Sequence, residues 1–218
     1  FEQLEGRIAP ALFNVLNPVT VSGTGNYGCV ATGDFNGDGR SDMVLTNYGT
    51  AGPGNNAGGN TISILLGNGN GTFGNASNIT LGTNQYVSFV AVGDLNGDSK
   101  LDLAVASTSE DSTGRLYIYL GTGSGGFTAS PQSPISTGSS NACWVGIAQV
   151  TSGDSNADVV VAGFGDSDQG QTTIFGNNIN VFQGDGTGAV NSIGTVTNGL
   201  AFIPTAIAIA KSALFSAV

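Results

Sequence analysis

Two stretches of this 218-residue chain nearly repeat one another: VATGDFNGDGRSDMVLT at residues 30–46 and VAVGDLNGDSKLDLAVA at residues 90–106. Each begins with a short apolar run, passes through nine residues rich in Asp, Asn and Gly, and returns to a second apolar run. Short apolar runs bounded by Gly, Asn and Asp are typical of β-strands joined by tight turns. The pattern therefore predicts a strand, an acidic loop and a second strand, recurring after 60 residues.

The repeat extends beyond these two stretches. Each is followed by an alternating run that ends in a glycine-rich turn, and then by a further short strand-like run. A third, weaker copy of the first stretch spans residues 145–163. Alternation has the period of a strand rather than of a helix, so each unit is predicted to hold four strands. The alternating runs are ISILLGNGNGTF (62–73), LYIYLGTGSGGF (116–127) and INVFQGDGTGAV (179–190), and the short runs lie near Ile79, Ile135 and Ile193.

Four-stranded antiparallel units that recur about every 60 residues predict an all-β fold, and specifically a β-propeller. Three complete blades and a partial blade at each end are too few for a closed ring of seven, and an open arc leaves apolar sheet faces uncovered. We therefore expect further chain or a second subunit to complete a seven-bladed ring. The expected segments are a lead-in at 1–12 and propeller blades over 13–218: the last strand of a preceding blade at 13–25, complete blades at 27–84, 86–140 and 142–198, and a partial blade at 201–218.

The composition narrows the possible functions. There are 15 Asp and Glu against 5 Lys and Arg, the formal net charge is −10, and the pI is about 4.1. So few cations argue against a nucleic-acid partner, which needs clustered Lys and Arg. The absence of histidine excludes a Ser–His–Asp triad and imidazole metal ligands. No apolar run approaches the ~18 residues of a membrane helix, so no membrane insertion is expected. Cys29 and Cys143 leave two alternatives open, buried thiols or a disulfide.

The acidic loops are the strongest candidates for a functional site. In both, carboxylate or amide oxygens occupy positions 1, 3, 5 and 9, and the residue at position 7 could add its backbone carbonyl. Such hard oxygens suit Ca²⁺, whereas the strict octahedral geometry of Mg²⁺ suits them less. The alternative is a metal-free turn, because Asp, Asn and Gly dominate turns anyway. The expected calcium ligands are Asp34, Asn36, Asp38, Arg40 and Asp42 in the first loop, and Asp94, Asn96, Asp98, Lys100 and Asp102 in the second.

The third copy of the loop, residues 150–158, departs from this pattern. It keeps Asp154 and Asp158 at positions 5 and 9 but carries Val150 and Ser152 at positions 1 and 3. A hydrogen-bonded turn without metal is therefore the expected structure there. Towards the C-terminus, Lys211 stands where a fourth loop would place its first aspartate, so no metal is expected at that end.

The two acidic loops, together with the Gly-x-Phe that ends the third run of a unit, resemble the FG-GAP/VCBS repeats of integrin α-subunits and many secreted bacterial proteins. This resemblance implies a propeller of typically seven blades, calcium that rigidifies each loop, and extracellular adhesion or ligand binding. The opening residues FEQLEGRIAP (1–10) are similar to an LE-x-R-x-AP segment near the N-terminus of many planctomycete surface proteins.

The leading functional hypothesis is a calcium-binding, non-catalytic propeller, secreted or at the cell surface, used for adhesion, surface assembly or scaffolding. Its partner would be a protein or glycan at the cell surface. Two alternatives are a lectin-like carbohydrate-binding propeller and the propeller part of a secreted polysaccharide-degrading enzyme. No catalytic residue is expected, because the chain has no histidine and the clustered aspartates are assigned to metal loops.

Overall fold

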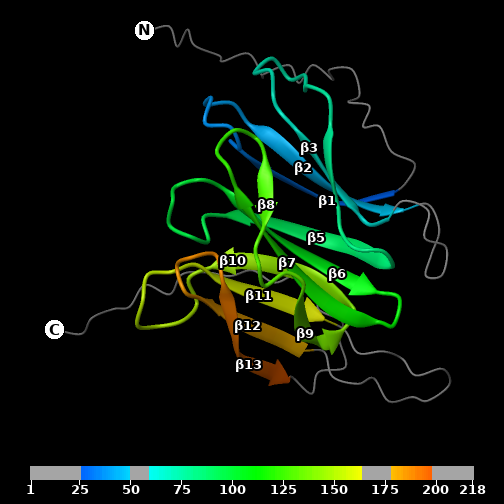
Figure 1. The fold of residues 1–218 in the computed structure, drawn as a ribbon, viewed down its shortest axis with the longest axis vertical. Coiled ribbons are helices and arrows are strands. Elements are labelled where there is room, and N and C mark those ends of the chain that lie inside the picture. The colour runs from blue at the N-terminus through cyan, green and yellow to red at the C-terminus, as the bar shows by residue number, and fades with distance from the viewer. Residues whose placement is uncertain (1–25, 50–58, 164–177, 198–218) are drawn as a thin grey trace, which may run out of the picture.

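A computed structural model describes residues 26–49, 59–163 and 178–197 (Figure 1). Every regular element in these ranges is a β-strand, which confirms the prediction of an all-β fold. None of the described residues forms a helix long and apolar enough to cross a membrane. The segments expected at 1–12, 13–25 and 201–218 lie outside the described residues.

The strands form three antiparallel sheets, each built from consecutive strands. This order confirms the prediction of meandering four-stranded units. The first sheet holds β1 (Asn26–Gly33), β2 (Asp42–Gly49), β3 (Thr61–Leu65) and β4 (Ser77–Thr80). The second holds β5 (Gln85–Gly93), β6 (Asp102–Ser109), β7 (Thr113–Gly121), β8 (Phe127–Ala129) and β9 (Ile135–Ser140). The third holds β10 (Ala142–Ala148), β11 (Asp158–Gly163), β12 (Asn178–Gly184) and β13 (Val190–Thr197).

The second sheet has one strand more than the sequence predicts. Its outer edge is split into β8 and β9, which pair with opposite ends of β7. Pro131 and Pro134 lie between them. Proline has no N–H to donate to a strand ladder, so the two prolines explain why this edge strand is interrupted.

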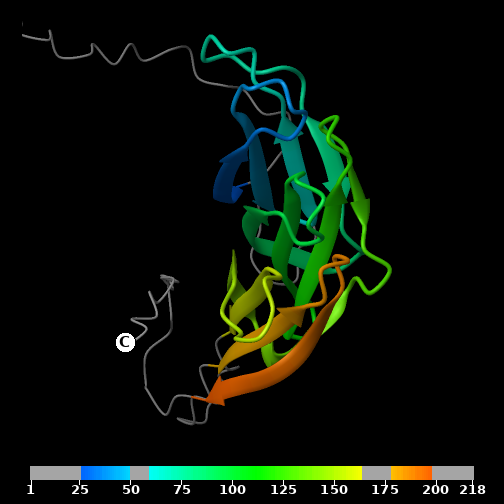
Figure 2. The same cartoon turned by 90° about the vertical axis from the view of Figure 1, so that its left-hand side faces the viewer.

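The three sheets pack face to face along a curve, as Figure 2 shows. Their first strands are neighbours, with β1 against β5 and β5 against β10. The middle sheet is buried on both faces: in β6, Leu103 and Val105 pack towards the first sheet, and Ala104 and Ala106 towards the third. Burial on both faces explains why β6 reads as a continuous run of apolar and small residues rather than an alternating one. The described residues form an open arc and do not close into a ring.

The second residue of each of the first two acidic loops joins its sheet to the next one. Phe35 is 3 % exposed and meets Phe127 of the second sheet edge to face, with ring centroids 5.5 Å apart. The backbone N–H of Gly125 donates to the carbonyl of Phe35 at 2.9 Å. Leu95 occupies the same position in the next loop and is buried in one cluster with Val190 of the third sheet. The acidic loops are therefore part of the packing between sheets.

We predict that Phe35→Ala lowers the free energy of unfolding by about 3–5 kcal/mol, because it removes a fully buried ring and leaves a cavity between two sheets. Phe35→Leu should lose less than half of that, since leucine already fills the equivalent position at residue 95. Urea denaturation of the three proteins measures the difference. Equal stability of Phe35→Ala and the wild type would show that this side chain does not hold the sheets together.

Candidate metal centre

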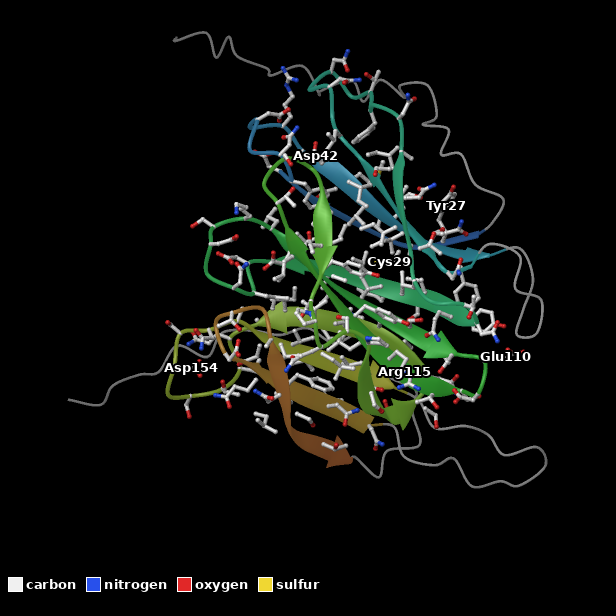
Figure 3. All side chains as sticks on the ribbon, viewed as in Figure 1. Tyr27, Cys29, Asp42, Glu110, Arg115 and Asp154 are labelled. Carbon is white, nitrogen blue, oxygen red and sulfur yellow. The ribbon has the colours of Figure 1, made fainter. Side chains whose placement is uncertain are left out.

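The three loops emerge at the same end of the three sheets, on the left of Figure 1. They connect β1 to β2, β5 to β6 and β10 to β11. Asp154, which marks the third loop in Figure 3, lies on the opposite side of the molecule from Glu110 in the turn after β6. The stacking of the repeats therefore places all the predicted metal ligands on one face.

The first aspartate of each of the two acidic loops holds that loop in its folded shape. One carboxylate oxygen of Asp34, Oδ1, accepts the N–H of Gly37 at 2.8 Å, and the other, Oδ2, accepts that of Gly39 at 2.8 Å. Both glycines have positive φ, at 74° and 79°, which other residues rarely adopt. The N–H of Gly39 is the main reason why the pKa of Asp34 is lowered. Asp94 accepts two N–H groups of its own loop in the same way.

The residues at positions 5 and 7 form an ion pair within each of the two acidic loops. Asp98 Oδ1 accepts the backbone N–H of Lys100 at 2.9 Å, and Asp98 Oδ2 lies 3.0 Å from the Lys100 ammonium. The hydrogen bond from the Lys100 side chain is the largest cause of the lowered pKa of Asp98. In the first loop Arg40 and Asp38 make the looser equivalent pair, at 3.7 Å. The residue predicted to offer only a carbonyl thus also supplies a counter-charge.

The side chains at position 3 stabilise the turn itself. Asn36 Oδ1 accepts the N–H of Asp38 at 3.1 Å, and Asn96 Oδ1 accepts that of Asp98 at 3.1 Å. The loop backbone is therefore already closed by its own side chains, which leaves the remaining lone pairs of these oxygens as candidate ligands.

The ninth residue of each loop has a structural role that sequence reasoning did not assign. Asp102 is fully buried, and its two oxygens accept the N–H groups of Leu95 and Gly121, each at 2.8 Å. Asp42 is equally buried and makes the equivalent bonds to Phe35 and Gly67, also at 2.8 Å. One carboxylate thus ties the loop to the end of the third strand of its own sheet.

Glycine is required where the third strand meets this carboxylate. A Cβ atom built on Gly121 would lie 2.2 Å from the carbonyl oxygen of Leu101, and one on Gly67 would lie 2.2 Å from that of Ser41. Only glycine can bring its N–H this close to the buried aspartate. This contact explains the first glycine of the turn that ends each alternating run.

The third loop keeps this bond and the aspartate at position 5, but it lacks the acidic and amide residues at positions 1 and 3. Asp158 Oδ2 accepts the N–H of Val150 and the N–H and hydroxyl of Thr151, at 2.7–2.9 Å, and its Oδ1 accepts the N–H of Gly184 at 3.1 Å. Asp154 is held by the neutral side-chain amide of Gln183 at 2.9 Å instead of by a basic residue. The third loop has an aspartate at position 9 although it lacks the expected metal ligands at positions 1 and 3. This was the signal in the sequence that position 9 stabilises the fold whether or not a metal is bound.

The buried aspartates of the second and third loops differ in their electrostatics. Burial raises the pKa of Asp102, the N–H groups of Gly121 and Leu95 only partly offset this, and repulsion from Asp98 and Asp94 raises it further. For Asp158 burial also acts to raise the pKa, but the N–H groups of Thr151, Val150 and Gly184 outweigh it and the pKa is lowered. The second loop therefore holds more negative charge than its own donors stabilise, and the third does not.

The donor set of the two acidic loops fits a hard divalent cation in its chemistry: three carboxylates, one amide oxygen and a backbone carbonyl. Within the described ranges, however, no three acidic or cysteine side chains converge closely enough to hold a metal ion by themselves. A bound ion would add positive charge beside Asp94, Asp98 and Asp102, where Lys100 is the one basic residue of the loop.

The two cysteines lie apart from these loops. Neither Cys29 nor Cys143 is in a disulfide bond, which answers the alternative that the sequence left open. Burial raises the pKa of both thiols, so neither is activated as a thiolate.

We predict that Asp102→Ala strongly destabilises the protein even without metal, because it leaves two buried N–H groups without an acceptor, each worth about 1–3 kcal/mol. Asp98→Asn in the same loop is the matched control. It alters an exposed pair and should change the free energy of unfolding by less than about 0.5 kcal/mol. Urea denaturation in excess chelator measures both. Similar stabilities of the two variants would refute the structural role of Asp102.

Comparison with known protein families agrees with this architecture. The model of the FG-GAP-like repeat matches residues 34–105 and 94–152, so that the two matches together span more than half of the chain. Both matches begin at the first aspartate of an acidic loop. A search of curated proteins finds no match to the chain. The repeats, their loops and their sheets together show that this chain belongs to the FG-GAP-like repeat family.

Proposed function

We propose that this chain is a calcium-binding, non-catalytic part of an extracellular β-propeller that serves adhesion, surface assembly or scaffolding. Calcium would be held in the two acidic loops by Asp34, Asn36, Asp38, the Arg40 carbonyl and Asp42, and by Asp94, Asn96, Asp98, the Lys100 carbonyl and Asp102. The ion would contribute charge neutralisation and rigidity rather than reactivity. Belonging to the FG-GAP-like repeat family supports this proposal, because such repeats are typical of extracellular, non-catalytic modules.

The observation that carries the calcium proposal is the excess charge in the second loop. Burial raises the pKa of Asp102, two further carboxylates raise it more, and among the described residues the Lys100 ammonium is paired with Asp98. A divalent cation beside all three carboxylates would remove this repulsion and favour their ionised forms. No such repulsion is found at Asp158, which supports metal binding in the second loop rather than in the third.

The joints between sheets explain how calcium would affect the whole module. Phe35 and Leu95 come directly after the first aspartate of their loops, and both are buried against the following sheet. An ion that binds only the folded loop stabilises the folded state by mass action. Through these two side chains it would also fix the orientation of one sheet relative to the next, which suits a surface used for recognition.

Calcium removal should lower the melting temperature of the chain. At ten times Kd each site contributes about 1.4 kcal/mol, so two sites predict a decrease of roughly 5–10 °C for a chain of this size. Asp94→Ala removes one site and should roughly halve the decrease. Asp154→Asn, in the third loop, is the matched control, and chelation should lower its melting temperature as much as that of the wild type. The measurements are thermal melts in calcium and in chelator, with the bound metal quantified beforehand by elemental analysis.

Two outcomes would contradict the proposal. One is an unchanged melting temperature after chelation of protein shown to have carried calcium. The other is a stoichiometry that drops with Asp154→Asn but not with Asp94→Ala, because that result would place the metal in the third loop.

The proposed extracellular role has its own test. In cells that express the protein naturally, the propeller should either be recovered from the medium or remain on the cell surface. In the second case, a protease added to intact cells should degrade it. Chelation should accelerate this degradation, since loops without metal open more often. Protection from external protease until the cells are lysed would place the protein inside the cell and overturn the extracellular assignment.

A further inference from the structure

A cavity of about 200 Å³ lies at the opposite end of the sheets from the acidic loops. Figure 3 labels Glu110, one of its residues, on the far side of the molecule from Asp154. All three sheets contribute to the cavity, so it exists only because the sheets are stacked. Its lining consists of Tyr48 from β2, Tyr86 and Ser88 from β5, Thr108, Ser109, Glu110 and Ser112 from β6 and the turn after it, and Asn141, Ala142 and Cys143 at the start of β10.

The rim of this cavity is held in a defined shape. Asn84, Ser112 and Asn141 lie in or beside it and have positive φ angles of 59°, 64° and 45°, a conformation that residues other than glycine seldom adopt. Backbone hydrogen bonds connect the segments: Glu110 N–H donates to the Asn84 carbonyl at 3.0 Å, and Asn141 N–H to that of Ser112 at 2.9 Å. Strained backbone conformations persist where the surrounding structure enforces them, and they are frequent at binding sites.

The chemistry of the lining matches a polyhydroxyl ligand. Ser, Thr and Asn side chains carry both donors and acceptors, although the Ser88 and Ser109 hydroxyls already donate to the Ala142 carbonyl and to Asp111. The Glu110 carboxylate could accept hydrogen bonds from the hydroxyl groups of a sugar. Tyr48 is 41 % exposed and presents an aromatic ring on which the apolar face of a sugar ring could lie. The volume is below the 300–1,000 Å³ of sites for drug-sized molecules, which suits about one sugar unit.

The charge of the cavity restricts the kind of sugar. None of the described lining residues is Lys or Arg. Next to Glu110, hydrogen bonds from Ser109 and Thr113 lower the pKa of Asp111 to about 2, so this second carboxylate is ionised at neutral pH. Asp111 lies beside the cavity and interacts with the charge of Arg115, whereas Glu110 is in the lining itself. A lining with one carboxylate and no described cation would repel uronic acids and sulfated sugars.

We propose that this cavity binds a single neutral hexose or N-acetylhexosamine unit of a glycan. The inference rests on the proposed adhesion function, for which it names the class of ligand, but it does not depend on the calcium loops at the other end of the sheets. Tyr48 would stack on the sugar ring, and Glu110 and Asn141 would bind its hydroxyl groups.

The test uses the intact chain with calcium present and the methyl glycosides of glucose, galactose, mannose and N-acetylglucosamine as probes. Saturation-transfer NMR detects binding, and calorimetry gives Kd. We expect at least one glycoside to bind, and methyl glucuronide to bind at least about tenfold more weakly. Tyr48→Ala and Glu110→Gln should each weaken binding about tenfold, the loss that corresponds to one good contact. Tyr27→Ala is the matched control: this tyrosine is 39 % exposed, does not line the cavity, and should change Kd less than twofold.

The possible failures of the two proposals can be told apart. If no glycoside binds while chelation still lowers the melting temperature, the sugar site is overturned and the calcium proposal stands. If a glycoside binds and Tyr48→Ala weakens its binding, but chelation does not change the melting temperature, the sugar site stands and the calcium proposal is overturned. Binding that Tyr27→Ala weakens as much as Tyr48→Ala, or methyl glucuronide that binds as tightly as the neutral glycosides, would overturn the assignment of this cavity to neutral sugars.

Discussion

The interaction on which this structure depends is made in each sheet by one buried aspartate, which accepts backbone N–H groups from its own loop and from the glycine that follows or ends the third strand. In the second sheet Asp102 connects Leu95 in the acidic loop to Gly121 at the end of β7. A buried carboxylate is tolerable only when its oxygens are hydrogen-bonded, so this geometry leaves little freedom in either partner. The loop consequently has one position relative to its sheet before any ion binds.

That position determines how neighbouring sheets meet. Because the carboxylate bonds to the second residue of the first two loops, it also orients the side chain of that residue, Phe35 or Leu95, towards the next sheet. In the third loop the second residue is Thr151, whose hydroxyl turns back to Asp158. In all three loops the N–H of the second residue donates to the buried aspartate. Phe35 and Leu95 then pack against the next sheet, whereas Thr151 bonds back to its own loop.

The two ends of the stacked sheets differ in chemistry. At one end, the first two loops each carry three carboxylates, and in the second loop Asp94 and Asp98 repel the buried Asp102. At the other end, strand residues from all three sheets and the turns beside β6 and β10 line a small cavity with hydroxyl, amide, tyrosine and carboxylate side chains. The cavity shares no residue with the acidic loops, so the two sites can be altered and tested separately.

The sequence by itself determined the repeat, the strands and the candidate ligands, because alternation and the spacing of Asp, Asn and Gly are local properties of the chain. It predicted four-stranded antiparallel units, and it missed the split edge of the second sheet although Pro131 and Pro134 marked it. Only the tertiary structure decided that position 9 is a buried structural anchor, that Phe35 reaches Phe127, and that residues of three sheets line one cavity. Burial and contacts between sheets arise from stacking, and no local pattern in one repeat specifies which atoms of the next repeat it will meet.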